Sequence, residues 1–151
     1  MKYEEYAALF KLKMLDVKDL IRISLELIEA GFYSDALLEL AWEDYPRLDD
    51  AVALFEKGLR DIDFVEPSKE RSLILLGNIY CKQILSGEIS PYEGSRSIWN
   101  VICSQKEAAS YFFEFVPLSD ALQNYCEPKA AEAFENCIIE EAKKVVALVN
   151  V

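Results

Sequence analysis

Apolar side chains return every three or four positions along most of this chain, the spacing that gathers them on one face of an α-helix. The clearest stretch begins at residue 48, and its apolar positions are Leu48, Val52, Phe55, Leu59 and Ile62. Charged residues occupy most of the positions between them. We therefore expect a helix that buries one face and turns a charged face to solvent.

A more apolar helix, over residues 67–86, is expected at the centre of the fold. Leu73, Ile74, Leu75 and Leu76 are consecutive, and further apolar residues follow as far as Leu85. Consecutive apolar residues point in several directions around a helix, so neighbouring helices must cover this one on most sides.

Capping residues, glycines and prolines predict where the helices begin and end. The sharpest signal is a capping box of Ser90 and Glu93, with Pro91 at the first helical position. Asp16 is placed to cap a helix that Gly31 ends in the left-handed conformation. Pro117 is expected to break the chain after an aromatic segment. Helices are predicted at residues 3–14, 17–30, 48–62, 67–86 and 119–126, between Ser34 and Pro46, and from Pro91 and Pro128 onward.

No segment alternates apolar and polar residues in the way that predicts β-strands. The chain has 151 residues, 52% of them hydrophobic, which is enough to bury a core without disulfides. The prediction is an all-α fold: a single domain over residues 1–151 with seven to nine helices. They are expected to form an irregular bundle or stacked antiparallel helical hairpins.

The cysteines are expected to be reduced core residues. Cys81, Cys103, Cys126 and Cys137 are far apart in the sequence, and each lies in an apolar helical stretch. No CxxC pair occurs and the chain has no histidine, so no metal site is predicted. Without histidine there is also no Ser-His-Asp triad and no HExxH zinc site.

Carboxylates alone could still hold Mg²⁺. Glu26 and Glu29 form an ExxE pair, as in all-α nucleotide pyrophosphohydrolases of the MazG type, but the ExxD that such enzymes carry on the following helix is absent. Glu132 and Glu135 form a second ExxE without a partner motif. Solvated helix faces explain both pairs, since glutamates three apart are common on exposed helices.

The aromatic residues are assigned mainly to packing. Trp42 and Trp99 are expected to lie in the core or between helices. The segment from Tyr111 to Phe115 has four aromatic residues, which cannot all share one face. Some of them must be exposed or lie under a loop, so this segment is a candidate contact surface.

The formal charge is −11, from 27 acidic and 16 basic residues. Such a field repels nucleic acid and anionic lipid and attracts basic surfaces, so neither nucleic acid nor a membrane is expected as a partner. No apolar run reaches the ~20 residues that span a bilayer, and the chain opens with acidic residues where a signal peptide is basic. The expected compartment is the cytoplasm.

Much of the negative charge falls in two predicted turns. The first includes Glu43 and surrounds Pro46, and the second includes Glu66, at the other end of the helix over residues 48–62. Solvated loops explain these charges, and docking of a basic partner is the functional alternative. The candidate contact residues are Asp44, Tyr45, Asp49, Asp50, Asp61 and Asp63.

The segment from Gly87 to Gly94, which reads GEISPYEG and is followed by Trp99, resembles a motif of small, acidic, helical bacterial proteins of unassigned function. Some of those proteins are similar to immunity proteins that neutralise secreted toxins. The resemblance extends over residues 87–99 and implies a helical binding protein.

The leading hypothesis is therefore a non-enzymatic acidic protein-binding domain, such as a bacterial immunity protein or inhibitor that covers a basic toxin domain. No catalytic residue, metal or cofactor is assigned under this hypothesis. A helical-hairpin adaptor or scaffold that binds a peptide or another helix is the alternative. A second alternative is a Mg²⁺-dependent hydrolase using Glu26 and Glu29.

Overall fold

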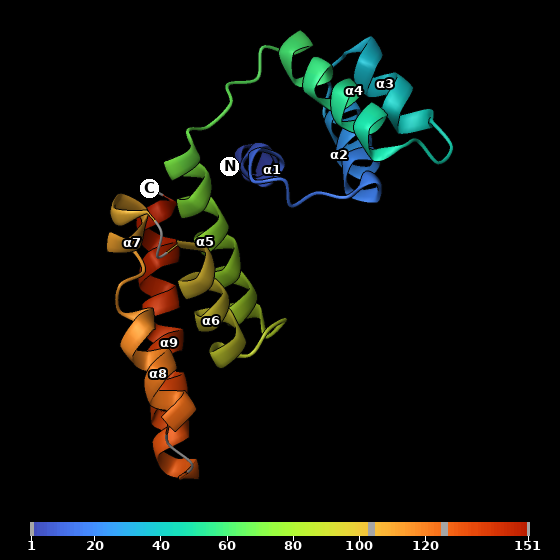
Figure 1. Ribbon diagram of the computed structural model, residues 1–151. Coiled ribbons are helices and arrows are strands. Elements are labelled where there is room, and N and C mark those ends of the chain that lie inside the picture. Colours follow the sequence, from blue (N-terminus) through green and yellow to red (C-terminus); the bar gives the residue numbers. More distant parts are fainter. Residues whose placement is uncertain (1, 103–104, 125–126, 151) are drawn as a thin grey trace. The chain divides into compact units, whose positions relative to one another are not determined.

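The computed structural model describes residues 2–102, 105–124 and 127–150, and over these residues the chain forms helices and no strand (Figure 1). The predicted all-α fold is confirmed, with nine helices in the described part. No helix among the described residues has the length and apolarity needed to cross a bilayer. The helices are α1 Lys2–Lys11, α2 Val17–Glu29, α3 Asp35–Trp42, α4 Leu48–Asp61, α5 Lys69–Ser86, α6 Pro91–Ile102, α7 Lys106–Ser110, α8 Phe115–Asn124 and α9 Pro128–Val149.

The internal contacts of the chain divide it into two compact units. The three-helix unit runs from Leu9 to Glu66 and contains α2, α3 and α4 with the end of α1. The five-helix unit runs from Pro67 onward and includes the start of α1 through Ala8. That residues 1–151 fold as a single domain stays a prediction.

In the three-helix unit, α2, α3 and α4 each contact the other two (Figure 1). Phe55 of α4 is fully buried, and its ring meets that of Phe10 edge to face, with centroids 4.9 Å apart. The other large buried side chains come from α2 and α3: Leu20, Ile23, Leu27, Leu37 and Leu40.

The buried face of α4 differs from the predicted stripe. Ala51, Phe55 and Gly58 are its buried residues, whereas Leu48 is half exposed. Gly58 explains the shift, because a Cβ at this position would lie 2.4 Å from Cδ2 of Leu37. Only glycine lets α4 approach α3 this closely, and that approach turns Leu48 outward.

In the five-helix unit, α5 lies at the centre, as predicted. Its residues from Ser72 to Asn78 are all buried, and α6, α7 and α9 contact it. The start of α1 also pairs with α5. Glu4 accepts from Nε of Arg71 at 2.9 Å, and Glu5 accepts from Nζ of Lys82. The hydrogen bond from Arg71 lowers the pKa of Glu4.

Local capping explains most of the observed boundaries. The capping boxes of Asp16 with Asp19 and of Ser90 with Glu93 are both formed. Gly31 has φ +94° and Gly87 has φ +78°, so both take the left-handed conformation that ends a helix.

The prediction that Pro117 breaks the chain before a helix at 119–126 is wrong. Pro117 is the third residue of α8, which begins at Phe115. The first four backbone N–H groups of a helix have no partner inside it, so a residue without an N–H is tolerated there.

The cysteines do not share one environment. Cys81 is fully buried in α5, and this burial raises the pKa of its thiol to about 12. Cys137 on α9 is exposed, contrary to the prediction that it lies in the core. Cys103 and Cys126 lie outside the described residues.

We predict that iodoacetamide labels Cys137 in the native protein and labels Cys81 only after unfolding. Iodoacetamide reacts with the thiolate form of cysteine. Cys137 is open to the reagent, whereas Cys81 is buried and its raised pKa disfavours the thiolate. Peptide-resolved mass spectrometry measures the two sites separately. Equal labelling of both in the native state would contradict the described burial.

We predict that Gly58→Ala destabilises the protein by about 1–3 kcal/mol, because the new methyl group overlaps Leu37. Leu37→Ala creates a cavity and costs about 2–5 kcal/mol by itself. The double variant should be less destabilised than the sum of the two by at least about 1 kcal/mol, since each change makes room for the other.

Urea denaturation measures all three stabilities. Lys57→Ala, an exposed change next to Gly58, is the control and should stay within about 0.5 kcal/mol of the wild type. Strict additivity of Gly58→Ala and Leu37→Ala would show that the close contact of α3 with α4 is absent.

Candidate functional site

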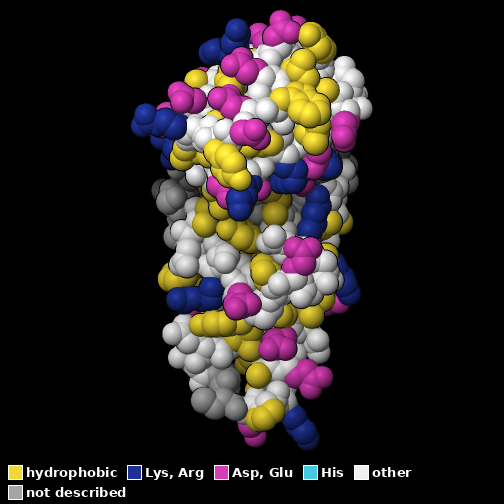
Figure 2. Space-filling model, turned by 90° about the vertical axis from the view of Figure 1, so that its right-hand side faces the viewer, with side chains coloured by type: hydrophobic (Ala, Val, Ile, Leu, Met, Phe, Trp, Pro, Cys, Tyr) yellow, Lys and Arg dark blue, Asp and Glu magenta, His cyan; other side chains and the backbone are white. Residues whose placement is uncertain are grey.

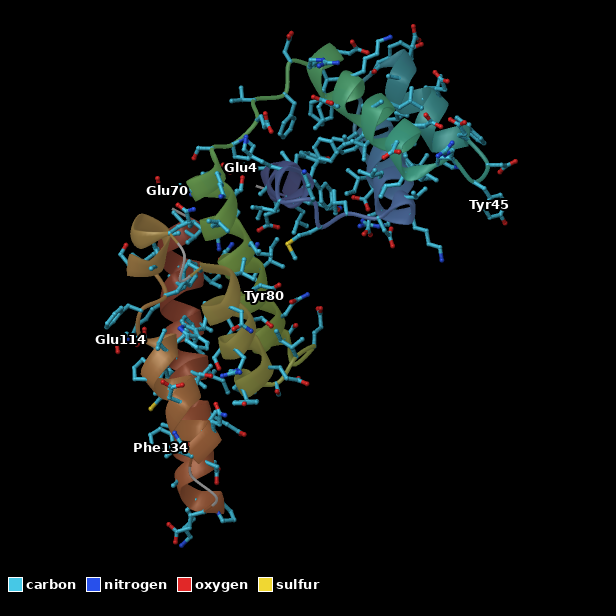
Figure 3. All side chains as sticks on the ribbon, in the orientation of Figure 1. Glu4, Tyr45, Glu70, Tyr80, Glu114 and Phe134 are labelled. Atoms are coloured by element: carbon cyan, nitrogen blue, oxygen red, sulfur yellow. The ribbon has the colours of Figure 1, made fainter. Side chains whose placement is uncertain are left out.

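The turn between α3 and α4 exposes large apolar side chains. The exposed fraction is 76% for Trp42, 98% for Tyr45 and 50% for Leu48. Tyr45 lies at the tip of this turn and points away from the helices (Figure 3). Soluble monomers rarely group exposed aromatic residues, and such groups mark contact sites. We call residues 42–50 the α3–α4 surface.

The backbone of the α3–α4 surface holds Tyr45 in a costly conformation. Its φ is +53°, in the left-handed region that bulky residues avoid. A residue held there costs about 1–3 kcal/mol. Folding alone therefore gives no reason to keep a tyrosine at this position.

Acidic residues surround these apolar side chains. Glu43, Asp44, Asp49 and Asp50 are all exposed, and Arg47 is the one basic residue from position 42 to position 50. The three-helix unit as a whole contains 14 acidic and 7 basic residues, so −7 of the formal charge of −11 belongs to it. The face of α2–α4 that is visible in Figure 2 shows acidic side chains beside a cluster of hydrophobic ones.

Two of these acids also stabilise the helix that they begin. Arg47 stands at the N-cap of α4, where its side chain forms no capping hydrogen bond. Asp49 and Asp50 lie in the first turn, where negative charge interacts favourably with the helix dipole.

The six predicted contact residues fall at opposite ends of α4. Asp44, Tyr45, Asp49 and Asp50 belong to the α3–α4 surface, but Asp61 ends the helix and Asp63 follows it. Twelve residues separate Asp49 from Asp61, which is about 18 Å along a helix. The structure therefore brings together the first four and not the last two.

Asp61 has a structural task of its own. Its Oδ2 accepts a hydrogen bond from Oγ of Ser34 at 2.8 Å, and Ser34 is the buried N-cap of α3. Asp61 thus helps to fix the start of α3.

Trp42 and Leu48 belong to the α3–α4 surface but were not among the predicted contact residues. The prediction that Trp42 lies in the core or between helices is wrong, and so is the prediction that Leu48 lies on a buried stripe. A signal for Trp42 was present in the sequence, because Glu43 and Asp44 follow it directly and the turn-forming Pro46 comes four positions later.

A hollow of about 430 Å³ borders the α3–α4 surface and shares Leu48 and Asp49 with it. Phe10, Leu15 and Val52 supply further apolar walls. At its edge, Nζ of Lys11 lies 3.0 Å from Oε1 of Glu66. This hollow is large enough to receive a side chain from a partner.

The ExxE pairs have ordinary surroundings. Oε1 of Glu26 accepts from Nη1 of Arg22 at 2.9 Å, and Glu29 is exposed. Glu132 and Glu135 are both exposed on α9. Over the described residues, no three His, Cys, Asp or Glu side chains are grouped as metal ligands.

The aromatic segment after α7 is divided, as its composition predicted. Phe112 and Phe115 are buried, whereas Tyr111 and Phe113 are exposed. Leu148 of α9 is also exposed and lines the same shallow hollow as Tyr111 and Phe113. These three side chains form a second exposed apolar group, in the five-helix unit.

Comparison with protein-family models, with curated proteins and with solved structures finds no match for this chain.

We predict that Tyr45→Asn stabilises the protein by roughly 1 kcal/mol, because asparagine tolerates the left-handed conformation better than tyrosine. Thermal unfolding measures the difference. Tyr33→Asn is the control, since Tyr33 is also exposed, at 68%, but does not have a positive φ. Destabilisation by Tyr45→Asn would mean that the tyrosine contributes to folding.

Proposed function

We propose that this chain is a non-enzymatic protein-binding domain whose α3–α4 surface docks on a basic protein partner, in the manner of an immunity protein covering a toxin domain. The observation that carries the proposal is Tyr45, a nearly fully exposed tyrosine in a strained backbone conformation beside an exposed Trp42. Strain without a folding benefit is typical of functional sites.

Trp42, Tyr45 and Leu48 have the chemistry of interface anchors. Tryptophan and tyrosine are enriched among the few residues that supply most of the binding energy at interfaces. Both bury a large area and lose little side-chain entropy on binding. We assign the affinity for the partner mainly to these three side chains.

The surrounding acids supply attraction and orientation. Glu43, Asp44, Asp49 and Asp50 form a rim around the anchors, and the −7 charge of the three-helix unit extends the same field. Such a field speeds encounter with a basic surface more than it tightens the final complex. It also selects against acidic partners.

A helical adaptor is the second candidate function. The exposed group of Tyr111, Phe113 and Leu148 favours it, because it offers a second apolar contact surface on the five-helix unit. An adaptor that binds through apolar contacts would show little dependence on salt.

We predict that the wild-type chain captures a basic protein from lysate of its native host and that Trp42→Ala with Tyr45→Ala abolishes this capture. Loss of each buried anchor typically costs about 2 kcal/mol or more. Tyr33→Ala is the matched control and should leave capture unchanged. Mass spectrometry identifies the captured protein, and circular dichroism checks that each variant is folded.

The acidic residues are expected to act on the rate of association. With the captured partner, Asp44→Asn, Asp49→Asn and Asp50→Asn together should slow association at least about tenfold at low salt and change dissociation little. Asp63→Asn, at the far end of α4, should have a smaller effect. Capture that survives loss of both aromatic side chains would refute the proposal, and capture that is indifferent to salt would favour the adaptor.

A further inference from the structure

A pocket of about 270 Å³ lies between α6 and the residues from α7 to the start of α8. Every described side chain that lines it is apolar: Ile98, Trp99, Ile102, Ala109, Phe112, Phe113 and Val116. Three of them, Ile98, Ile102 and Phe112, are buried, whereas Phe113 is 68% exposed. The pocket therefore leads from the surface into the core of the five-helix unit.

The floor of the pocket is fixed by a close contact with α5. A Cβ at Gly77 would lie 2.3 Å from Cζ of Phe112 and 2.7 Å from Cδ1 of Ile102. Glycine thus lets both side chains lie directly against the central helix. Because their positions are set by core packing, the pocket is formed before any ligand arrives.

Arg96 lies on the turn of α6 that precedes these residues. Its guanidinium lies over the ring of Trp99, 5.5 Å from the centroid, and its Nη1 donates to Oε1 of Gln123 on α8 at 3.3 Å. Trp99 therefore both lines the pocket and packs under the guanidinium of Arg96. Along α6, Arg96 is about 3–9 Å from the pocket residues 98–102.

Among the described residues, Arg96 and the exposed Arg47 have no carboxylate partner, whereas the other three arginines do. Arg22, Arg60 and Arg71 each pair with a carboxylate. Arg96 is half buried, and no carboxylate of the described residues pairs with it. A guanidinium has five N–H donors, so most of those on Arg96 remain available to a ligand.

We infer that this pocket binds a small anionic amphiphile, a free carboxylate with a single short apolar tail. The tail would fill the apolar pocket, and the carboxylate would take a bidentate position on Arg96. The volume lies just below the roughly 300–1,000 Å³ of pockets for drug-sized ligands, which limits the tail to a single short chain or ring. This site is in the five-helix unit and does not rest on the α3–α4 surface.

The test uses sodium octanoate and 1-octanol, which share the tail and differ in the charged group. Trp42→Phe leaves Trp99 as the single tryptophan, so its fluorescence reports on the pocket wall. Titration should give a saturable change, with octanoate binding at least about tenfold tighter than octanol, since a charge-assisted hydrogen bond is worth about 1.4 kcal/mol or more. Isothermal titration calorimetry provides a second reading that is independent of Trp99.

Variants separate the two halves of the site. Arg96→Gln should reduce octanoate to the affinity of octanol and leave octanol unchanged. Arg47→Gln removes the same charge from an exposed position and should change neither ligand. Ala109→Leu, which fills the pocket, should weaken both ligands at least about tenfold.

Three results would overturn the inference: no saturable binding of octanoate, equal affinities for octanoate and octanol in the wild type, or an Arg96→Gln variant that still prefers octanoate. The alternative occupant is an aromatic side chain, and N-acetyl-phenylalanine amide is the probe for it. If it binds more tightly than octanoate, the pocket receives an aromatic side chain of a partner protein and not a free carboxylate.

Discussion

The packing of three short helices around Phe55 is the constraint on which the α3–α4 surface depends. Helix α3 has eight residues and buries Ala36, Leu37 and Leu40. Trp42 comes two positions after Leu40 and therefore lies on the opposite side of α3, because a helix has 3.6 residues per turn. Once α3 is docked through Leu37, Trp42 must face solvent, and the short turn before α4 must leave Tyr45 exposed as well.

The same acidic residues serve folding and the proposed binding. Asp49 and Asp50 stabilise the start of α4, and Asp61 holds Ser34 at the start of α3. Negative charge is therefore built into both ends of this helix by local requirements. Tyr45 differs from these acids, since its conformation costs free energy and no contact within the unit recovers it.

Local signals made most helix boundaries predictable. Asp16, Ser34, Ser90, Gly31 and Gly87 act within one helical turn of their own position, so the sequence alone was sufficient to assign them. The division into two units was not predictable, because no linker or change of composition marks residues 8–9 or 66–67.

The sequence predicted only part of the candidate site, because which apolar side chains are exposed depends on how α3 and α4 pack. Periodicity shows that α4 has an apolar face, but the buried centre of that face depends on its neighbours. Gly58 meets Leu37, which moves the buried centre to Ala51 and Phe55 and exposes Leu48. Acidic residues of the turn were visible in the sequence, whereas the anchors beside them required the packing of α3 on α4.

Amide hydrogen exchange shows which residues of this chain a partner covers. The exchange of the chain alone is compared with that of its complex with the captured partner, peptide by peptide. The proposed function predicts that protection on binding is concentrated in residues 42–50. Protection confined to residues 111–116 and 145–148, with unchanged exchange in residues 42–50, would contradict it and would move the partner site to the five-helix unit.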